Sequence, residues 1–180
     1  MVIVFKEKLK DLLDQNVKCE VDAAVLIPIK DGRDPKIIMI KRGKNLTRSS
    51  GHVAFPGGMI EKNETPKDAA LREVKEELGI DGVEILGYLN PTIVMTYEIW
   101  LYPVVGLIKN LEFKPDEFEV SKVLIDNLEK VLKSRTVTDW GATFYCDGEL
   151  VWGASSRVLD DLYIRIIKRY ENLERFFKDY

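Results

Sequence analysis

The sequence has 180 residues, 46% hydrophobic and 32% charged, a composition that excludes a disordered or fibrous chain. Its 27 basic and 30 acidic side chains give a formal charge of −3, so no nucleic-acid partner is expected. Two cysteines, Cys19 and Cys146, provide neither a disulfide framework nor a multi-cysteine zinc site, which favours a cytoplasmic protein.

The first part of the chain predicts a helix, two strands and a long loop. Apolar residues at helical spacing predict the helix over 3–15. Hydrophobic runs at 21–30 and 36–42, separated by an Asp-Gly-Arg-Asp-Pro turn, predict the two strands. The small and polar residues of 43–58 then predict a functional loop that contains a short strand at 53–55.

The helix that follows this loop has clear end signals. Thr65 is an N-cap, Pro66 occupies the first helical position and Asp68 completes a capping box. Gly79 is expected to end the helix in a left-handed conformation.

The remaining elements complete an α/β pattern. Hydrophobic patterning predicts two strands, a short helix, a hairpin and a long closing helix, at 83–89, 98–108, 126–133, 143–152 and about 154–178. The longest uncharged stretch, 85–97, is too short to span a bilayer, so no membrane association is expected. We therefore expect one domain over 1–180, with helices on both faces of a mixed sheet.

Three glutamates share one face of the capped helix. At about 100° per residue, Glu77 lies about 40° and Glu76 about 60° from Glu73. Three carboxylates repel one another unless a cation lies between them, and Arg72 neutralises only one. The remaining charge suits a hard divalent cation, Mg²⁺ or Mn²⁺. An ordinary solvated helix face is the alternative interpretation of this short pattern taken alone.

The other residues of the helix are expected to divide between this face and the core. Ala69 and Ala70 lie on the glutamate side one turn earlier, which predicts open space above the carboxylates. Leu71, Val74 and Leu78 lie on the opposite side and are expected to face the core.

Residues 58–80 match a longer pattern, G-x5-E-x7-R-E-U-x-E-E-x-G-U, in which U is aliphatic. At every fixed position the sequence resembles the Nudix box of the Nudix hydrolase superfamily. The resemblance implies a Nudix fold, an α/β/α sandwich with a mixed β-sheet. It also implies hydrolysis of a nucleoside diphosphate linked to a further group, with Mg²⁺ or Mn²⁺ as cofactor.

The same resemblance implies roles for individual residues. The implied metal ligands are the carboxylates of Glu73, Glu76 and Glu77 and the backbone carbonyl of Gly58. Glu64 and Arg72 are expected to orient these glutamates. In the later acidic loop, Glu117 or Glu119 is expected either to act as an extra ligand or base, or to be a solvated loop charge.

Two further stretches, 37–58 and 151–159, resemble the coenzyme A diphosphatase branch of this superfamily. The upstream signature is matched at Arg42, Gly51, Phe55, Pro56, Gly57 and Gly58. Three positions of the signature are not matched: its threonine is Ile40, its small residue is Gly43 and its second arginine is Thr47 in this sequence. An arginine, Arg48, follows one position later. The resemblance implies cleavage of coenzyme A or acyl-CoA to 3′,5′-ADP and 4′-phosphopantetheine or its acyl form.

We expect the substrate to be bound by Arg42, Arg48, His52, Phe55 and Gly57. The two arginines suit the coenzyme's 3′-phosphate, and a solvated basic loop is the alternative. His52 either donates a hydrogen bond to a phosphate or fixes the loop.

The function and the partners leave alternatives open. The protein is expected to act on a small-molecule nucleotide diphosphate, with ADP-ribose or another nucleoside diphosphate as the second possibility. A non-catalytic nucleotide-binding module is the third. Tyr97, Trp100 and Tyr102 either stack on adenine or pack in the core or in a homodimer interface.

Overall fold

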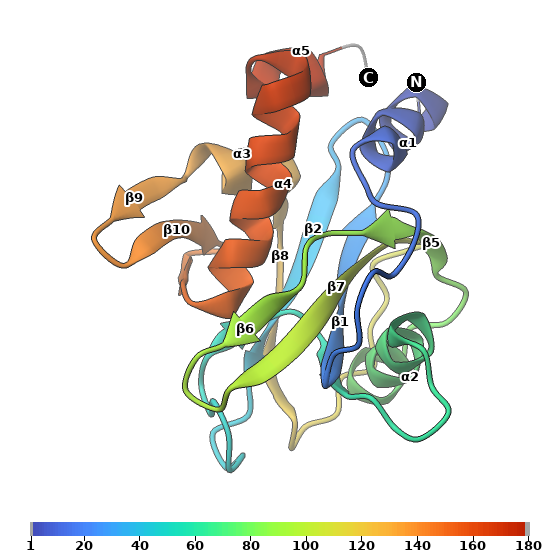
Figure 1. The fold of residues 1–180 in the computed structure, drawn as a ribbon, viewed down its shortest axis with the longest axis vertical. Helices are drawn as coiled ribbons and strands as arrows, with labels where there is room; N and C mark the ends of the chain where they lie inside the picture. Colours follow the sequence, from blue (N-terminus) through green and yellow to red (C-terminus); the bar gives the residue numbers. More distant parts are fainter. Residues whose placement is uncertain (1, 179–180) are drawn as a thin grey trace.

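A mixed, eight-stranded sheet forms the centre of the computed structural model, which describes residues 2–178 (Figure 1). Its strands are β1 (Ala23–Lys30), β2 (Lys36–Arg42), β3 (Val53–Ala54), β4 (Gly57–Met59), β5 (Glu84–Tyr88), β6 (Thr92–Val94), β7 (Ile99–Ile108) and β8 (Val120–Asn127). The order is β3-β2-β1-β7-β5, and β4, β6 and β8 pair with β1, β7 and β2 respectively. Only β1 and β7 run parallel to each other, which makes the sheet mixed.

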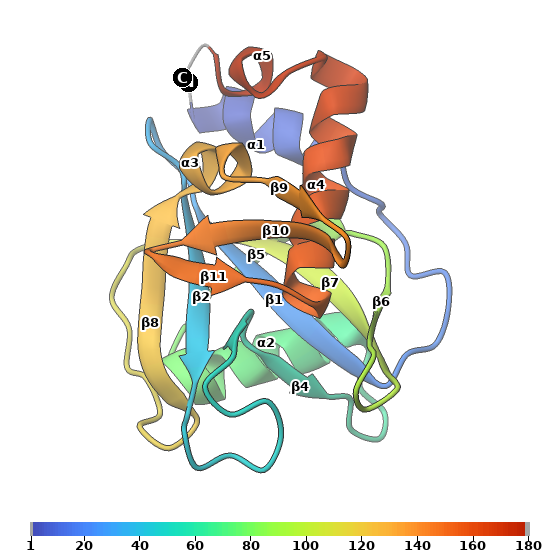
Figure 2. The same ribbon diagram turned by 90° about the vertical axis from the view of Figure 1, so that its left-hand side faces the viewer.

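Helices cover both faces of this sheet, as predicted. Helix α2 (Pro66–Leu78) lies on one face, and Figure 1 shows α4 (Ala154–Tyr170) on the other side of β1 and β7. The remaining helices are α1 (Val2–Asp11), α3 (Leu128–Lys133) and α5 (Leu173–Phe177). A second sheet, shown in Figure 2 beside α3 and α4, consists of β9 (Thr136–Thr138), β10 (Gly141–Cys146) and β11 (Glu149–Val151).

Alternate residues of β1 contribute to two separate cores. Ala24 and Leu26 pack with the buried residues of α2, whereas Ile27 and Ile29 pack with α1, α3, α4 and α5. This alternation is the period-2 pattern of a strand buried on both faces. The fold is therefore a three-layer α/β/α arrangement, and the prediction of the fold class is confirmed.

The end signals of α2 are confirmed in detail. The Thr65 hydroxyl accepts a hydrogen bond from the Asp68 N–H at 3.2 Å, and the Asp68 carboxylate accepts one from the Thr65 N–H at 3.0 Å. Gly79 ends the helix at φ 68°, a left-handed conformation that favours glycine.

The expected division of α2 into an open side and a core side is only partly correct. Val74 and Leu78 are fully buried in the core, as expected. Ala69 and Ala70 are fully buried against the sheet, so no open space lies above them, and Leu71 is only half-buried. Glu77 lies within the buried arc, between Ala69 and Ala70 on the helical wheel. The helix therefore presents a carboxylate toward the sheet because the small alanines let it pack closely there.

The long closing helix predicted over 154–178 is two helices. The chain reverses at Glu171, whose φ is 69°, and Asn172 then caps α5 by accepting a hydrogen bond from the Arg175 N–H at 2.9 Å. The break places the Phe176 ring 5.9 Å from the Phe5 ring. Burial of these aromatic rings against α1 accounts for the turn.

Several other elements differ from the prediction. Strands β4, β6, β8 and β9 were not predicted, and the short helix expected near 126–133 begins at Leu128, directly after β8. The first helix ends at Asp11 rather than at residue 15, because Asp14 forms a β-bridge with Tyr88. None of the helices within 2–178 combines the length and hydrophobicity needed to cross a bilayer.

Candidate active site

Three carboxylates converge beside the C-terminal half of α2. Glu73 and Glu77 come from the helix, and Glu119 comes from the loop that precedes β8. Each offers one oxygen that lies within 4.8 Å of the others. We call this group the acidic centre.

Glu77 is the most constrained member of the acidic centre. Its side chain is 2% exposed, and its Oε1 accepts a hydrogen bond from the Gly57 N–H at 3.3 Å. Its Oε2 is buried without a hydrogen-bond partner among the described residues. Burial, followed by the charge of Glu73, raises the pKa of Glu77 to about 8.

This arrangement fits a bound cation. A buried carboxylate oxygen normally has a hydrogen-bond partner. The Oε2 of Glu77 has none among the described residues, and the two neighbouring carboxylates add negative charge that a bound cation would balance. Mg²⁺ and Mn²⁺ prefer carboxylate oxygens. The acidic centre can therefore hold a hard divalent cation.

Two glycines allow the backbone of β4 to approach its neighbours closely. A Cβ atom on Gly58 would lie 2.5 Å from Glu73 Oε1, and a Cβ on Gly57 would lie 2.3 Å from the Ala24 carbonyl oxygen. Side chains at these positions would displace either the Glu73 carboxylate or strand β1. The glycines matched in the sequence signature are thus required by close packing around the acidic centre.

Arg72 organises the glutamates from the outer side of α2. Its guanidinium donates to both carboxylate oxygens of Glu64, at 2.8 and 2.9 Å, and to Glu73 Oε1 at 2.9 Å. It also donates to the Met59 carbonyl at 3.1 Å. Pairing with Arg72 holds the pKa of Glu64 below its usual range. Glu76 contacts Arg72 at 3.5 Å, is 53% exposed and lies outside the acidic centre.

The position of Glu119 depends on a close contact between its loop and the end of β2. The Gly43 N–H donates to the Glu119 carbonyl at 2.8 Å, and a Cβ on Gly43 would lie 1.9 Å from the Phe118 carbonyl oxygen. The Asp116 side chain accepts from the Glu119 N–H at 3.0 Å. Burial and the neighbouring carboxylates raise the pKa of Glu119. Glu117, by contrast, is exposed and lies outside the acidic centre.

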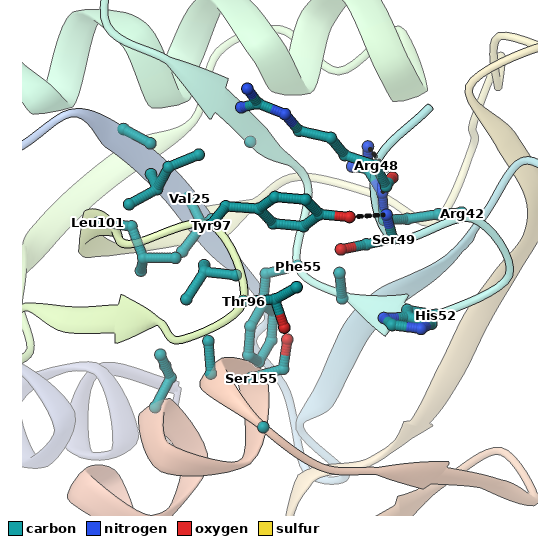
Figure 3. Close-up of a pocket in the computed structure, with 18 of the residues that line it drawn as sticks. Val25, Arg42, Arg48, Ser49, His52, Phe55, Thr96, Tyr97, Leu101 and Ser155 are labelled. Carbon is teal, nitrogen blue, oxygen red and sulfur yellow. Dashed lines mark hydrogen bonds between the residues drawn. The ribbon is translucent and has the colours of Figure 1, made fainter. Parts of the chain in front are cut away.

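A cavity of about 410 Å³ adjoins the acidic centre at Gly57 and Gly58. Figure 3 shows Arg42 and His52 on one side of it and Val25 and Leu101 on the other, with the Tyr97 ring between them. The cavity thus has a polar, cationic side and an apolar side. Ligand sites commonly combine these two surfaces.

Two loops meet at the Tyr97 side chain. The Ser49 N–H donates to the Tyr97 hydroxyl at 3.4 Å, which Figure 3 marks as a dashed line. The Arg48 guanidinium lies over the Tyr97 ring, 5.2 Å from its centroid. Arg42 donates to the Arg48 carbonyl at 3.3 and 3.4 Å, so the loop after β2 is also held from its own strand.

The structure brings the predicted substrate-binding residues together. All of them line the cavity: Arg42, Arg48, His52, Phe55 and Gly57. The His52 ring lies 4.9 Å from Trp152. Of the three aromatic residues considered for adenine, Tyr97 lines the cavity, Tyr102 is buried and Trp100 does not contribute to the lining.

Sequence reasoning did not assign Arg157 to the site. This residue lines the cavity from α4. The sequence contained a signal for this residue, because residues 151–159 resemble a stretch of the coenzyme A diphosphatase branch. That resemblance did not assign a role to Arg157.

The sequence matches the NUDIX domain family over residues 20–145. The chain belongs to the Nudix family. A relative from Salmonella paratyphi B, named "Uncharacterized Nudix hydrolase NudL", is 32% identical over 163 residues, which cover 80% of this chain and 82% of that protein.

Solved Nudix structures share the fold. A MutT/nudix family protein from Enterococcus faecalis aligns with a TM-score of 0.57 at 14% identity, covering 93% of this chain and 71% of that one. The MutT protein from Methanosarcina mazei aligns with a TM-score of 0.55 at 17% identity, covering 86% and 98%. The alignments support the Nudix fold, and the family match makes this chain a Nudix hydrolase.

Proposed function

We propose that this Nudix hydrolase cleaves the diphosphate of coenzyme A or acyl-CoA, producing 3′,5′-ADP and 4′-phosphopantetheine or its acyl form. The observation that carries this proposal is the junction between the acidic centre and a cavity with cationic and apolar sides. A diphosphate bound beside Gly57 and Gly58 would lie next to both the acidic centre and the residues that line the cavity. The likeness of residues 37–58 to the coenzyme A diphosphatase signature favours this substrate.

The residues of the acidic centre would hold Mg²⁺ or Mn²⁺. The bound metal supplies polarisation of the phosphoryl oxygens and activation of a water molecule. Glu73, Glu77 and Glu119 provide the carboxylate oxygens, and the unpartnered Oε2 of Glu77 supports this assignment. Glu76 and the Gly58 carbonyl remain predicted additional ligands. Glu119 is the better candidate of the two loop glutamates, for a ligand or a base, because Glu117 is exposed and lies outside this centre.

Arg72 and Glu64 are positioning residues in this proposal. The Arg72 guanidinium fixes the Glu73 carboxylate, and Glu64 holds both edges of that guanidinium. Glu64 also accepts a hydrogen bond from the Glu61 N–H at 2.9 Å, which ties the loop before α2 to the same network. The network keeps one carboxylate oriented before any substrate binds.

The cationic side of the cavity would bind the substrate's phosphates. Arg42 lines the cavity, and its positive charge offsets a small part of the rise that burial causes in the pKa values of Glu77 and Glu119. The Arg48 guanidinium lies over the neutral Tyr97 ring, and it has no carboxylate partner among the described residues. A guanidinium group without a carboxylate partner suits phosphate binding, because it can form charge-assisted hydrogen bonds to phosphate without first breaking an ion pair.

The apolar side would accept the less polar part of the ligand. Val25 and Leu101 lie on adjacent parallel strands, and Phe55 closes the cavity beside them. This surface can pack against adenine or against the pantetheine and acyl portion.

The proposal is tested with a panel of substrates in the presence of Mg²⁺ or Mn²⁺. The panel contains coenzyme A, acetyl-CoA, ADP-ribose, NADH, diadenosine polyphosphates and nucleoside triphosphates. We expect the highest kcat/KM for coenzyme A or its acyl derivative, with 3′,5′-ADP as one product. A higher kcat/KM for ADP-ribose would contradict the proposal, and hydrolysis of none of them would favour a nucleotide-binding module. Glu73→Gln, which retains the shape of the site, is the matched inactive control.

A further inference from the structure

The arginines that line the cavity differ from most others in the chain. A carboxylate lies within 4 Å of each of the following: Arg72, Arg135, Arg165, Arg169 and Arg175. No such carboxylate is found among residues 2–178 for Arg33, Arg42, Arg48 and Arg157. All of these except Arg33 line the cavity. Guanidinium groups without counter-ions are thus concentrated at one place.

Arg157 is held in a fixed orientation without being neutralised. Its Nε donates to the Thr92 hydroxyl at 3.0 Å, and its Nη2 donates to the Ile93 carbonyl. Both acceptors are uncharged, so they orient the guanidinium but leave its charge uncompensated. Partial burial lowers the pKa of Arg157, because desolvation disfavours the charged form.

A comparison with Arg135 shows what a purely structural arginine looks like in this protein. The Arg135 Nε contacts the Asp160 carboxylate at 2.6 Å, and its guanidinium lies over the Tyr163 ring. Both the charge and the planar face of Arg135 therefore have partners. A tether between α4 and β6 would need neither a free charge nor a position on a cavity wall, yet Arg157 has both.

The location of Arg157 separates it from the reacting diphosphate. It belongs to α4, which packs on the sheet face opposite to α2 and its glutamates. A diphosphate bound at the acidic centre would lie on the α2 side of the cavity. Arg157 therefore suits a phosphate group that lies elsewhere on the ligand.

We propose that Arg157 is a specificity-determining residue that binds the substrate's additional phosphate, the one outside the cleaved diphosphate. This inference rests on the proposed function, since coenzyme A carries such a group on its 3′-oxygen. Arg157 would approach this phosphate from α4, Arg42 from the end of β2 and Arg48 from the loop that follows β2. The guanidinium is already oriented by Thr92 and Ile93, so little side-chain entropy is lost on binding.

The first test compares substrates with and without this phosphate. The kcat/KM ratio of coenzyme A to 3′-dephospho-coenzyme A is measured for the wild type and for Arg157→Gln. A charge-assisted phosphate contact predicts a fall in this ratio of about 10- to 100-fold, mainly through KM for coenzyme A. Arg157→Lys is expected to retain part of the ratio, because the ammonium keeps the charge without the planar fork.

A binding measurement provides a readout that does not depend on turnover. Isothermal titration in Mg²⁺ compares 3′,5′-ADP with 5′-AMP, which differ only in the 3′-phosphate. The wild type is expected to bind 3′,5′-ADP more tightly, and Arg157→Gln is expected to remove most of this difference while leaving 5′-AMP affinity nearly unchanged.

Two control variants separate phosphate binding from structural roles. Thr92→Val removes one acceptor of Arg157 but keeps the guanidinium, and Arg33→Gln removes an unpaired arginine that does not line the cavity. Arg33→Gln is expected to keep the wild-type substrate ratio, and Thr92→Val is expected to lower it much less than Arg157→Gln, because the Ile93 carbonyl still orients the guanidinium. If Thr92→Val lowers the ratio as much as Arg157→Gln, the residue is a tether and the inference is wrong.

The outcomes distinguish this inference from the proposed function. Hydrolysis of coenzyme A with an unchanged ratio in Arg157→Gln would overturn the inference and leave the diphosphatase standing. Failure of the wild type to hydrolyse coenzyme A would overturn both. If thermal melting shows that Arg157→Gln does not fold, Arg157→Lys decides the question, and an unchanged ratio in that variant is the contrary result.

Discussion

Replacing Glu77 with Gln removes one charge from the acidic centre at nearly constant size. Glu77 is 2% exposed, and its pKa is raised to about 8 from an ordinary value of 4.5, first by burial and then by Glu73. The folded protein therefore holds this proton more tightly than the unfolded chain does. Without metal, the folded state loses stability as the pH rises from about 4.5 to 8. The Gln variant has no proton to lose and is expected to escape this part of the pH dependence.

The magnitude follows from proton linkage. Between pH 5 and pH 8, the unfolding free energy of Glu77→Gln is expected to rise relative to wild type by about 3–4 kcal/mol. Urea unfolding in EDTA, followed by circular dichroism at both pH values, measures this difference. Since Glu73 and Glu119 contribute to the raised pKa of Glu77, the difference between the two proteins reports the change that the substitution makes to the acidic centre as a whole. Parallel pH profiles for the two proteins would refute the reasoning.

The same variant links the acidic centre to metal binding. Mg²⁺ is expected to raise the urea midpoint of the wild type at pH 8 but to have little effect on Glu77→Gln. Turnover of the variant is expected to fall by roughly 100-fold or more, because the metal provides much of the transition-state stabilisation.

The other predictions concern the residues around Glu77. Glu119→Gln should weaken Mn²⁺ binding measured by isothermal titration, whereas its matched neighbour Glu117→Gln should not, and equal effects would contradict the geometry. Gly58→Ala should reduce both Mn²⁺ affinity and kcat, because the new Cβ would lie 2.5 Å from Glu73 Oε1; wild-type activity in this variant would be the contrary result. Arg72→Lys loses the forked contacts of the guanidinium and should lower stability by about 1–3 kcal/mol, as measured by urea unfolding, with a parallel loss of kcat.

The sequence was sufficient to predict those features that depend on residues close together in the chain. The capping box at Thr65, the left-handed Gly79 and the Asp147-Gly148 hairpin each involve residues a few positions apart, and all three are present. Asn172 carried a similar local signal for the start of α5. It was overlooked because the apolar periodicity continues through the break.

Features that depend on distant pairing could not be predicted. Strand β8 is defined by its antiparallel pairing with β2, about 85 residues earlier in the chain, and its own sequence alternates only weakly. The same pairing decides which loop glutamate joins the acidic centre, because the Gly43 contact turns Glu119 inward. The burial of Glu77 likewise follows from how closely α2 packs on β1, which a helical wheel does not show.

The most direct test of the account is ³¹P NMR of coenzyme A incubated with the wild-type protein and Mg²⁺. We predict that the two diphosphate resonances disappear and are replaced by two monophosphate resonances, while the 3′-phosphate resonance persists, and that Glu77→Gln leaves the spectrum unchanged over the same time. An intact coenzyme A diphosphate, under conditions in which the protein cleaves another nucleotide diphosphate, would contradict the proposed substrate.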